Sequence, residues 1–152
     1  LKQYIGHGDL CFNNILVDQV SGCIKLIDPK AYWDKERNIL GLVDPNYDLA
    51  KLNHSCKYLY DSVVNNLFNL KYENKCNFIL EIYKPHEYET FNKFFKEIIV
   101  EKNLCTEDLN ILTGNLFLTM LPLHADSYER MIVFAIIGSI FMNDNSIKKF
   151  IL

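Results

Sequence analysis

The stretch from Gly6 to Pro29, GHGDLCFNNILVDQVSGCIKLIDP, constrains the fold more than any other part of the chain. Two runs of large apolar and β-branched residues, 15–17 and 23–27, flank the turn-forming residues 18–22, which predicts an antiparallel β-hairpin. A hairpin returns the chain to where it started. We therefore expect Asp28, directly after the second run, to lie beside Asn14, directly before the first.

The polar residues around this hairpin are of the types that phosphoryl transfer requires. Residues 7–14 read H-G-D-x-x-x-x-N, which is the spacing of a kinase catalytic loop. Asp9 suits the carboxylate that accepts a proton from the attacking hydroxyl, and Asn14 with Asp28 supplies oxygen ligands for Mg²⁺. The same residue types also form ordinary turns, so a chance match remains an alternative.

This pattern resembles the aminoglycoside phosphotransferase and choline kinase family of the protein-kinase-like fold, whose members carry H-G-D-x-x-x-x-N and then a strand that ends in I-D. The resemblance implies that Asp9 is the catalytic base and that His7 supports the loop. It also implies that Asn14 and Asp28 bind Mg²⁺ and, through it, the phosphoryl donor ATP. Pro29 replaces the Phe of protein kinases, which favours the branch that acts on small molecules.

A helix is predicted from Asp44 to Leu67, because apolar residues recur there at helical spacing. Asp48 lies in its first turn, in the context Y-D-L-A. The resemblance implies that this carboxylate accepts hydrogen bonds from the catalytic loop. The favourable interaction of an acidic residue with the helix N-terminus explains the same position without the loop.

Two further segments supply candidate substrate contacts. Residues 30–44 are predicted to form a loop over the mouth of the site, and residues 121–130, LPLHADSYER, form a polar corner between two apolar helices. The second segment resembles phosphotransferases encoded among bacterial capsular polysaccharide genes. The alternatives are a solvated loop and a capped helix with a packed histidine. The candidates are Lys30, Tyr32, Trp33, Asp34, Glu36, His124, Asp126, Glu129 and Arg130.

The predicted fold class is α+β and mostly α, as in a protein-kinase-like C-terminal lobe with one small β-hairpin and about four main helices. Further helices are expected over 86–101, 106–121 and 127–142, whereas 65–77 is expected to be a connecting loop. We expect residues 1–152 to form a single domain, with the N-terminal nucleotide-clamping lobe absent from this chain. The edge facing that lobe is then expected to expose apolar surface.

Composition excludes several classes of partner. The 16 basic and 19 acidic residues give a net charge of −3 without a Lys/Arg cluster, which argues against nucleic acid and membrane surfaces. The longest apolar run, 131–142, is shorter than the ~20 residues of a membrane span. The five widely spaced cysteines lack a C-x-x-C pair, which favours reduced thiols and a cytoplasmic location over disulfides or zinc.

The function expected from these observations is ATP- and Mg²⁺-dependent phosphorylation of a hydroxyl on a small molecule, such as a sugar or an amino alcohol, with surface polysaccharide biosynthesis as one setting. The expected partners are the nucleotide, that acceptor and the nucleotide-clamping lobe, without which the fragment is expected to be inactive. The alternative from another class is a noncatalytic binding or scaffold module that keeps the kinase-like lobe but transfers no phosphate.

Overall fold

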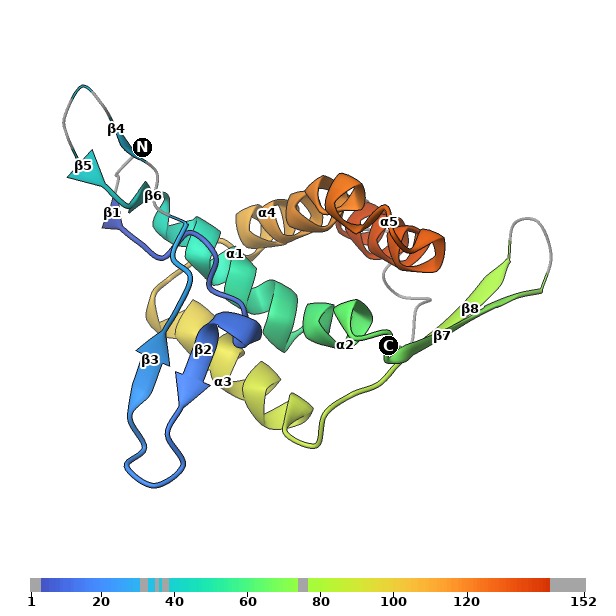
Figure 1. Cartoon of the computed structure of the whole chain (residues 1–152), viewed down its shortest axis with the longest axis horizontal. Helices are drawn as coiled ribbons and strands as arrows, with labels where there is room; N and C mark the ends of the chain where they lie inside the picture. The colour runs from blue at the N-terminus through green and yellow to red at the C-terminus, as the bar shows by residue number, and fades with distance from the viewer. Residues whose placement is uncertain (1–3, 31–32, 35, 37–38, 74–76, 143–152) are drawn as a thin grey trace.

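The computed structural model describes residues 4–30, 33–34, 36, 39–73 and 77–142. Within these ranges the chain is an α+β protein, mostly helical, and its strands form two-stranded antiparallel pairs (Figure 1). None of the helices in the described ranges has the length and apolar character needed to cross a membrane.

The helices are α1 Pro45–Cys56, α2 Tyr60–Val64, α3 Tyr88–Glu101, α4 Thr106–Thr119 and α5 Tyr128–Met142, with 3₁₀ turns η1 Phe12–Asn14 and η2 Leu121–His124. The paired strands are β1 Tyr4–Ile5 with β6 Leu42–Val43, β2 Ile15–Val17 with β3 Ile24–Leu26, β4 Trp33–Asp34 with β5 Ile39–Leu40, and β7 Phe68–Tyr72 with β8 Phe78–Ile82.

Helix α1 is the central element, with the α4–α5 pair on one side and α3 with the β2–β3 hairpin on the other (Figure 1). It begins at a side-chain cap, because Asp44 Oδ1 accepts a hydrogen bond from the Asn46 N–H at 2.8 Å and Pro45 occupies the first turn. Ala50 of α1 is fully buried and packs with Phe95 of α3 and Leu116 of α4. Burial on several sides fixes α1 as a rigid base for the rest of the domain.

Helices α4 and α5 pack closely because a glycine lies at their contact. A Cβ atom at Gly138 would lie 2.8 Å from the Leu118 side chain and 3.1 Å from the carbonyl oxygen of Gly114, so any larger residue would push the helices apart. Next to this contact, the rings of Phe117 and Phe134 are fully buried in the larger core cluster.

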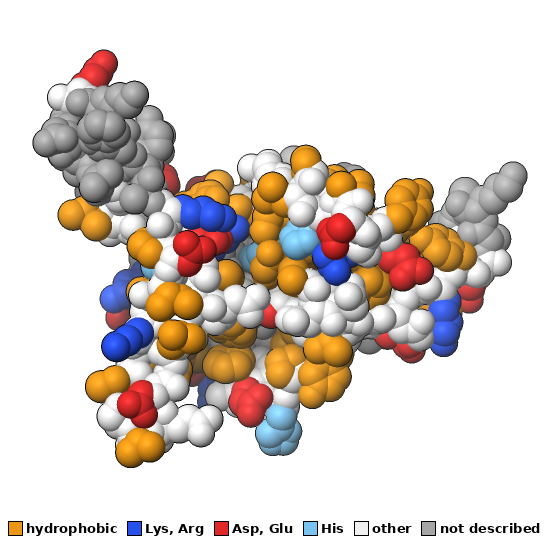
Figure 2. Space-filling model, in the orientation of Figure 1, with side chains coloured by type: hydrophobic (Ala, Val, Ile, Leu, Met, Phe, Trp, Pro, Cys, Tyr) orange, Lys and Arg blue, Asp and Glu red, His pale blue; other side chains and the backbone are white. Residues whose placement is uncertain are grey.

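The hairpin predicted from Gly6–Pro29 is present, with Ile15 opposite Leu26 and Val17 opposite Ile24. In its turn, Asp18 Oδ1 accepts hydrogen bonds from two backbone N–H groups, those of residues 20 and 21. The hairpin projects from the domain, and the exposed fractions of its apolar side chains at positions 16, 17, 24 and 26 lie between 49% and 66% (Figure 2). The domain therefore carries an exposed apolar edge at this hairpin.

The expected loop at 65–77 was wrong, and with it the expectation of one hairpin. Strand β7 lies within this segment and pairs with β8, so the described chain contains this hairpin in addition to β2–β3. The sequence F-N-L-K-Y alternates apolar and polar residues, and alternation places Phe68 and Leu70 against the core cluster while Asn69 and Lys71 face solvent. Residues 33–34, 39–40 and 42–43 also pair as short strands within the expected 30–44 loop.

The single helix expected over 44–67 was also wrong. It ends at Cys56, and after a break the chain forms the five-residue α2. Leu59 at the break has a left-handed backbone (φ 58°) and a side chain that is 3% exposed in the core, so packing sets this conformation against the local preference of leucine. Helices α3, α4 and α5 match the predicted spans to within about two residues. Residues 143–152, which follow the last predicted helix, lie outside the described residues.

Candidate active site

Residues 7–14, which we call the HGD loop, are held in place at their start by the first turn of α1. Asp48 accepts two hydrogen bonds of 2.7 Å, one at Oδ2 from the backbone N–H of His7 and one at Oδ1 from that of Gly8. A carboxylate with both oxygens engaged by backbone donors fixes the position and the orientation of the peptide units it binds. This is the contact that the family resemblance implied for Asp48.

Gly8 brings the HGD loop against the end of the hairpin. Its φ of 75° lies in the left-handed region, and a Cβ atom there would lie 2.5 Å from the Lys30 carbonyl oxygen. The backbone N–H of Lys30 donates to the carbonyl oxygen of His7 at 2.9 Å. Residues 28–30 are therefore fixed beside the start of the HGD loop.

The His7 imidazole links the loop to β3. Its Nε2 lies 2.8 Å from the carbonyl oxygen of Ile27, and its Nδ1 accepts a hydrogen bond of 3.3 Å from the Asp9 N–H. Because a carbonyl oxygen accepts and a backbone N–H donates, the ring is neutral with its proton on Nε2. The His7 ring therefore links the backbone of Asp9 to the backbone of the hairpin, which is the loop-supporting role expected of His7.

The Asp9 carboxylate lies between two lysines. Lys30 Nζ is 2.9 Å from Oδ2 and Lys51 Nζ is 3.0 Å from Oδ1, but the Lys51 side chain is 4% exposed whereas that of Lys30 is 60% exposed. Burial raises the pKa of Asp9, and the hydrogen bonds and charges of the two lysines outweigh burial, so that the pKa falls below its ordinary value. Asp9 is therefore ionised at neutral pH.

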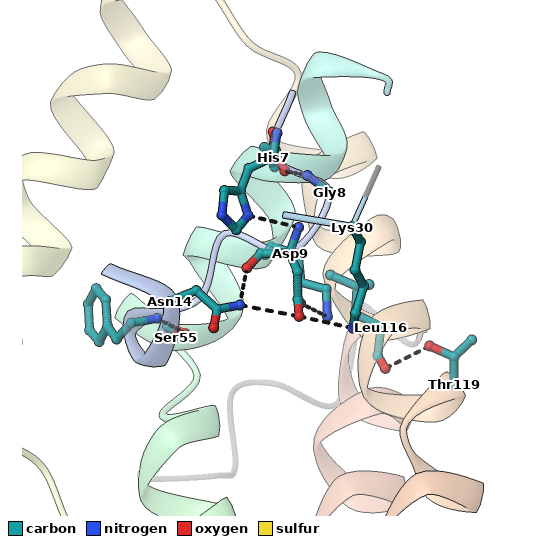
Figure 3. Close-up of polar contacts among 11 residues, drawn as sticks. His7, Gly8, Asp9, Asn14, Lys30, Ser55, Leu116 and Thr119 are labelled. Carbon is teal, nitrogen blue, oxygen red and sulfur yellow. Dashed lines mark hydrogen bonds and ion pairs between the residues drawn. The ribbon is translucent and has the colours of Figure 1, made fainter. Parts of the chain in front are cut away.

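Asn14 lies at the other end of the HGD loop and points its amide at Asp9 (Figure 3). Its Nδ2 donates to the Asp9 carbonyl oxygen at 2.8 Å and to Asp9 Oδ2 at 3.3 Å. Within the described residues this orientation leaves Oδ1, the atom that a cation needs, free of hydrogen bonds. The Ile27 N–H donates to the Asn14 carbonyl oxygen at 3.0 Å, which puts the residue before Asp28 directly beside Asn14.

Asn14 and Asp28 fit the partial ligand set that Mg²⁺ accepts from proteins. Asp28 is exposed two residues after the end of β3 and has a left-handed backbone (φ 53°), and the next hydrogen bond along the chain, from Lys30 N–H to the His7 carbonyl oxygen, joins this segment to the HGD loop. Mg²⁺ is commonly held by one or two carboxylates together with substrate phosphates and water, and these two residues supply one carboxylate and one amide oxygen. Larger clusters of three or more His, Cys, Asp or Glu suited to a metal are absent from the described part of the chain.

Sequence reasoning missed two residues of α1 that contact the HGD loop. Lys51 binds Asp9, and Ser55 Oγ accepts a hydrogen bond of 3.3 Å from the backbone N–H of Phe12. With Asp48 they follow the spacing i, i+3, i+7, which places all three on one side of a helix. We call these three residues the loop face of α1. The signal was present in the sequence, as polar residues at helical spacing between the apolar ones.

The corner at 121–130 brings the predicted His124, Asp126 and Arg130 together. Arg130 Nη1 lies 3.2 Å from His124 Nδ1 and 3.3 Å from Asp126 Oδ2, and its Nη2 donates to Asn66 Oδ1 at 2.9 Å. The Arg130 side chain is 11% exposed, whereas that of Asp126 is 68% exposed. Burial and the Arg130 charge lower the pKa of His124, so its Nδ1 is a neutral acceptor for the guanidinium.

A stack of rings separates this corner from the HGD loop. His54 of α1 stacks on Tyr60 with ring centroids 3.8 Å apart, and Tyr60 meets His124 edge-on at 6.3 Å. The corner is thus tied into the core, and its two acidic residues, Asp126 and Glu129, are exposed. Of the candidates in 30–44, Lys30 contacts Asp9 and Glu36 is exposed, while Tyr32 and the side chains of Trp33 and Asp34 lie outside the described residues.

Cys11, inside the HGD loop, is buried and lies near two carboxylates. Burial, followed by the charges of Asp9 and Asp61, raises the pKa of its thiol. A thiol held in its neutral form is a poor nucleophile, so the chemistry of this loop rests on its oxygen and nitrogen groups.

Comparison with protein-family models, with curated protein sequences and with solved structures found no match for this chain. The functional argument therefore rests on the geometry of the HGD loop.

Proposed function

We propose that this chain carries the catalytic and metal-binding half of a phosphotransferase that uses ATP and Mg²⁺ to phosphorylate a hydroxyl group on a small molecule. One observation carries the proposal: a carboxylate that is ionised at neutral pH, Asp9, lies hydrogen-bonded to the side chain of Asn14, and the backbone of Asn14 is hydrogen-bonded to Ile27, the residue before Asp28. A proton acceptor and two oxygen ligands then share one site, which is the arrangement that phosphoryl transfer needs.

In this proposal Asp9 accepts the proton of the acceptor hydroxyl while that oxygen forms its bond to phosphorus and the bond to the departing nucleoside diphosphate breaks. Asn14 Oδ1 and the Asp28 carboxylate would hold the Mg²⁺, which neutralises charge on the phosphates when it is bound. Lys51 stays buried against Asp9 and keeps the carboxylate oriented. The exposed Lys30 can leave Asp9 and contact a phosphate oxygen, since its side chain reaches solvent.

The acceptor contacts and the kinase-like fold belong to the same proposal. Asp126 is an exposed group of the corner that contacts Arg130, and Arg130 in turn contacts His124, so we assign Asp126 to the acceptor and the other two to support. The exposed apolar side chains of the β2–β3 hairpin are the surface that a nucleotide-clamping lobe would cover.

A noncatalytic kinase-like module is the second candidate, and a specific observation favours it. Both carboxylate oxygens of Asp9 are already in ion pairs, as they would be in a purely structural contact. The two candidates differ in the fate of the nucleotide, because a binding module holds Mg·ATP without converting it to ADP.

The test is calorimetry with ATP in the presence and absence of Mg²⁺, followed by ADP release with sugar and amino-alcohol acceptors. The proposal expects binding that depends on Mg²⁺ and that Asp28→Asn weakens by about tenfold or more. Asp18→Asn is the matched control, since Asp18 is a carboxylate in the turn of the same hairpin, where it accepts hydrogen bonds from the backbone N–H groups of residues 20 and 21.

Acceptor-dependent ADP release that Asp9→Asn lowers by about 10²–10⁴ supports a base. Binding without any release favours the noncatalytic module. Binding that is indifferent to Mg²⁺ and to Asp28→Asn overturns both.

A further inference from the structure

A cavity of about 340 Å³ lies between α1, α3 and α4, on the side of α1 that faces away from the HGD loop. Its wall includes Lys57 at the C-terminal end of α1, Asn92, Phe95 and Lys96 of α3, and Leu109 and Asn110 of α4. The volume lies at the lower end of the range for small-molecule sites, so it suits a ligand with few atoms.

The charge of this wall is uncompensated. Lys57 and Lys96 line the cavity, and within the described residues no Asp or Glu lines it and neither lysine forms an ion pair. The Lys57 ammonium instead lies 4.8 Å from the centroid of the Tyr58 ring. Burial and, after it, the positive charge of Lys96 lower the pKa of Lys57. Two neighbouring cations, one of them mostly buried, are unfavourable unless an anion joins them.

Amide groups extend this polar side of the wall. Asn110 Oδ1 accepts a hydrogen bond from the Tyr58 hydroxyl at 3.3 Å, which leaves the Asn110 Nδ2 donors without a protein acceptor in the described part of the chain. Asn92 also lines the cavity, and its Nδ2 donates to the Tyr88 carbonyl oxygen at 3.1 Å. The cavity therefore combines two cations with amide donors, which together suit carboxylate or phosphate oxygens.

The opposite side of the wall is apolar. Phe95 and Leu109 are 3% and 2% exposed and belong to the core cluster beneath the cavity, and Ile99 adds a partly buried aliphatic surface. A bare inorganic anion would leave this surface in contact with water. An aromatic or short aliphatic group would cover it.

We propose that this cavity is a second binding site, separate from the HGD loop, for a small organic anion: a carboxylate or phosphate ester carried on a compact apolar body. The anionic group contacts Lys57, Lys96 and the Asn110 amide, and the body lies on Phe95 and Leu109. The shared backbone of α1 joins the two sites, because Lys57 follows Ser55 and Lys51 by less than two turns.

The test titrates the full chain with phenyl phosphate and benzoate, and with phenol and inorganic phosphate as probes that lack one half of the ligand. Amide chemical shifts in ¹H–¹⁵N spectra report the location. The proposal predicts saturable binding of one or both organic anions with shifts centred on residues 92–110, and at least about tenfold weaker binding of phenol and of inorganic phosphate. If phenyl phosphate binds and benzoate does not, the ligand is a phosphate ester, and the reverse result identifies a carboxylate.

Three variants make this test specific. Lys57→Gln is predicted to weaken the preferred anion by about tenfold and Lys57→Arg to restore most of the affinity, since the charge returns. Lys93→Gln is the matched control, because Lys93 lies on the outer surface of α3 beside Lys96 but does not line the cavity.

The proposal is overturned if neither anion saturates in the millimolar range, if the shifts centre on residues 7–30, or if Lys93→Gln weakens binding as much as Lys57→Gln does. It is also overturned if phenol binds as tightly as the anions, because the lysines would then contribute nothing.

Discussion

The polar side chains on the two faces of α1 differ in whether they have hydrogen-bond or ion-pair partners. On the loop face, Asp48, Lys51 and Ser55 each have a partner in the HGD loop, at distances of 2.7–3.3 Å. On the opposite face, which we call the bundle face, the same spacing i, i+3, i+7 gives Ala50, Asn53 and Lys57. Ala50 packs, Asn53 Nδ2 donates to Thr113 Oγ1 at 3.0 Å, and Lys57 lines a cavity without an ion pair in the described chain.

The difference between the two faces is clearest for their lysines, Lys51 and Lys57. Lys51 is the more deeply buried lysine, and the charge of Asp9 offsets the cost of removing it from water. Lys57 keeps part of its hydration and meets another cation instead. The ammonium group of Lys51 is thus neutralised by an ion pair within the protein, whereas that of Lys57 is available to a ligand. The loop face positions the HGD loop, and the bundle face presents a lysine without a carboxylate partner in the described chain.

Removing Lys51 gives the largest expected effect. Lys51→Met leaves the buried Asp9 carboxylate with the exposed Lys30 alone, and breaking a buried pair in this way costs ~3–5 kcal/mol of the free energy of unfolding. Lys30→Met is the control, and an exposed pair contributes ~0–1 kcal/mol. Urea unfolding measures both. Equal losses in the free energy of unfolding would mean that the buried ion pair of Lys51 with Asp9 contributes no more to stability than the exposed pair of Lys30.

Substituting Gly8 tests the contact between the HGD loop and Lys30. Gly8→Ala meets a left-handed backbone and a carbonyl oxygen 2.5 Å away, while Gly22→Ala meets a left-handed backbone in open space. The strain common to both variants is ~1–2 kcal/mol, and we expect the clash to add ~1–3 kcal/mol for Gly8→Ala. Thermal unfolding compares them. Identical melting temperatures would contradict the tight apposition of loop and hairpin.

Asp48→Asn tests the cap on the HGD loop. The variant keeps one acceptor oxygen and places an amide against the second N–H, so we expect a loss of ~1–3 kcal/mol in unfolding free energy. Asp44→Asn on the same helix should be nearly neutral, because Asn serves equally well at an N-cap. Backbone hydrogen exchange at residues 7 and 8 should accelerate in Asp48→Asn. Unchanged exchange there would refute the role given to Asp48.

The effect that is smallest at neutral pH, and grows only as the pH falls, is on pH dependence and concerns His54, which lies between the two faces. Within the described chain neither ring nitrogen has a hydrogen-bond partner, and burial lowers the pKa of His54 well below 6.5. Because the unfolded state then binds the extra proton, stability is fully present above pH 6.5 and falls as the pH drops below it, by ~1.4 kcal/mol per pH unit.

His54→Phe keeps a ring to stack on Tyr60 and removes the proton site. Chemical unfolding between pH 5 and 7 should therefore show a flatter profile in the variant, with the part that remains due to His124, whose pKa is also lowered. A variant with the wild-type slope would exclude His54 as the source.

Much of the site could be predicted because its signals are local. The β-branched runs and the turn residues 18–22 sufficed to predict the β2–β3 hairpin, and the hairpin in turn predicted the meeting of Asn14 with the end of β3. Sequence reasoning missed Lys51 because it followed the apolar stripe of α1 and assigned no role to the lysine between those apolar residues. The helical spacing that Lys51 shares with Asp48 and Ser55 was a usable local signal, but its pairing with Asp9 depends on where the HGD loop lies.

The errors in the fold have the same origin. The alternation at 68–72 was a usable local signal for β7 that the polar composition obscured, so that hairpin could have been predicted. The break at Leu59 could not, because no Gly or Pro marks it and core packing imposes the left-handed backbone. The bundle-face cavity likewise arises from three helices distant in sequence.

The central claim is that Asn14 and Asp28 hold a divalent cation beside Asp9, and paramagnetic Mn²⁺ tests it most directly. Substoichiometric Mn²⁺ is predicted to broaden the amide resonances of residues 9–14 and 27–30, to spare those of α3, and to lose this effect in Asp28→Asn but not in Asp18→Asn. Broadening that is equal in the wild type and in Asp28→Asn, or that centres away from the HGD loop, would contradict the account.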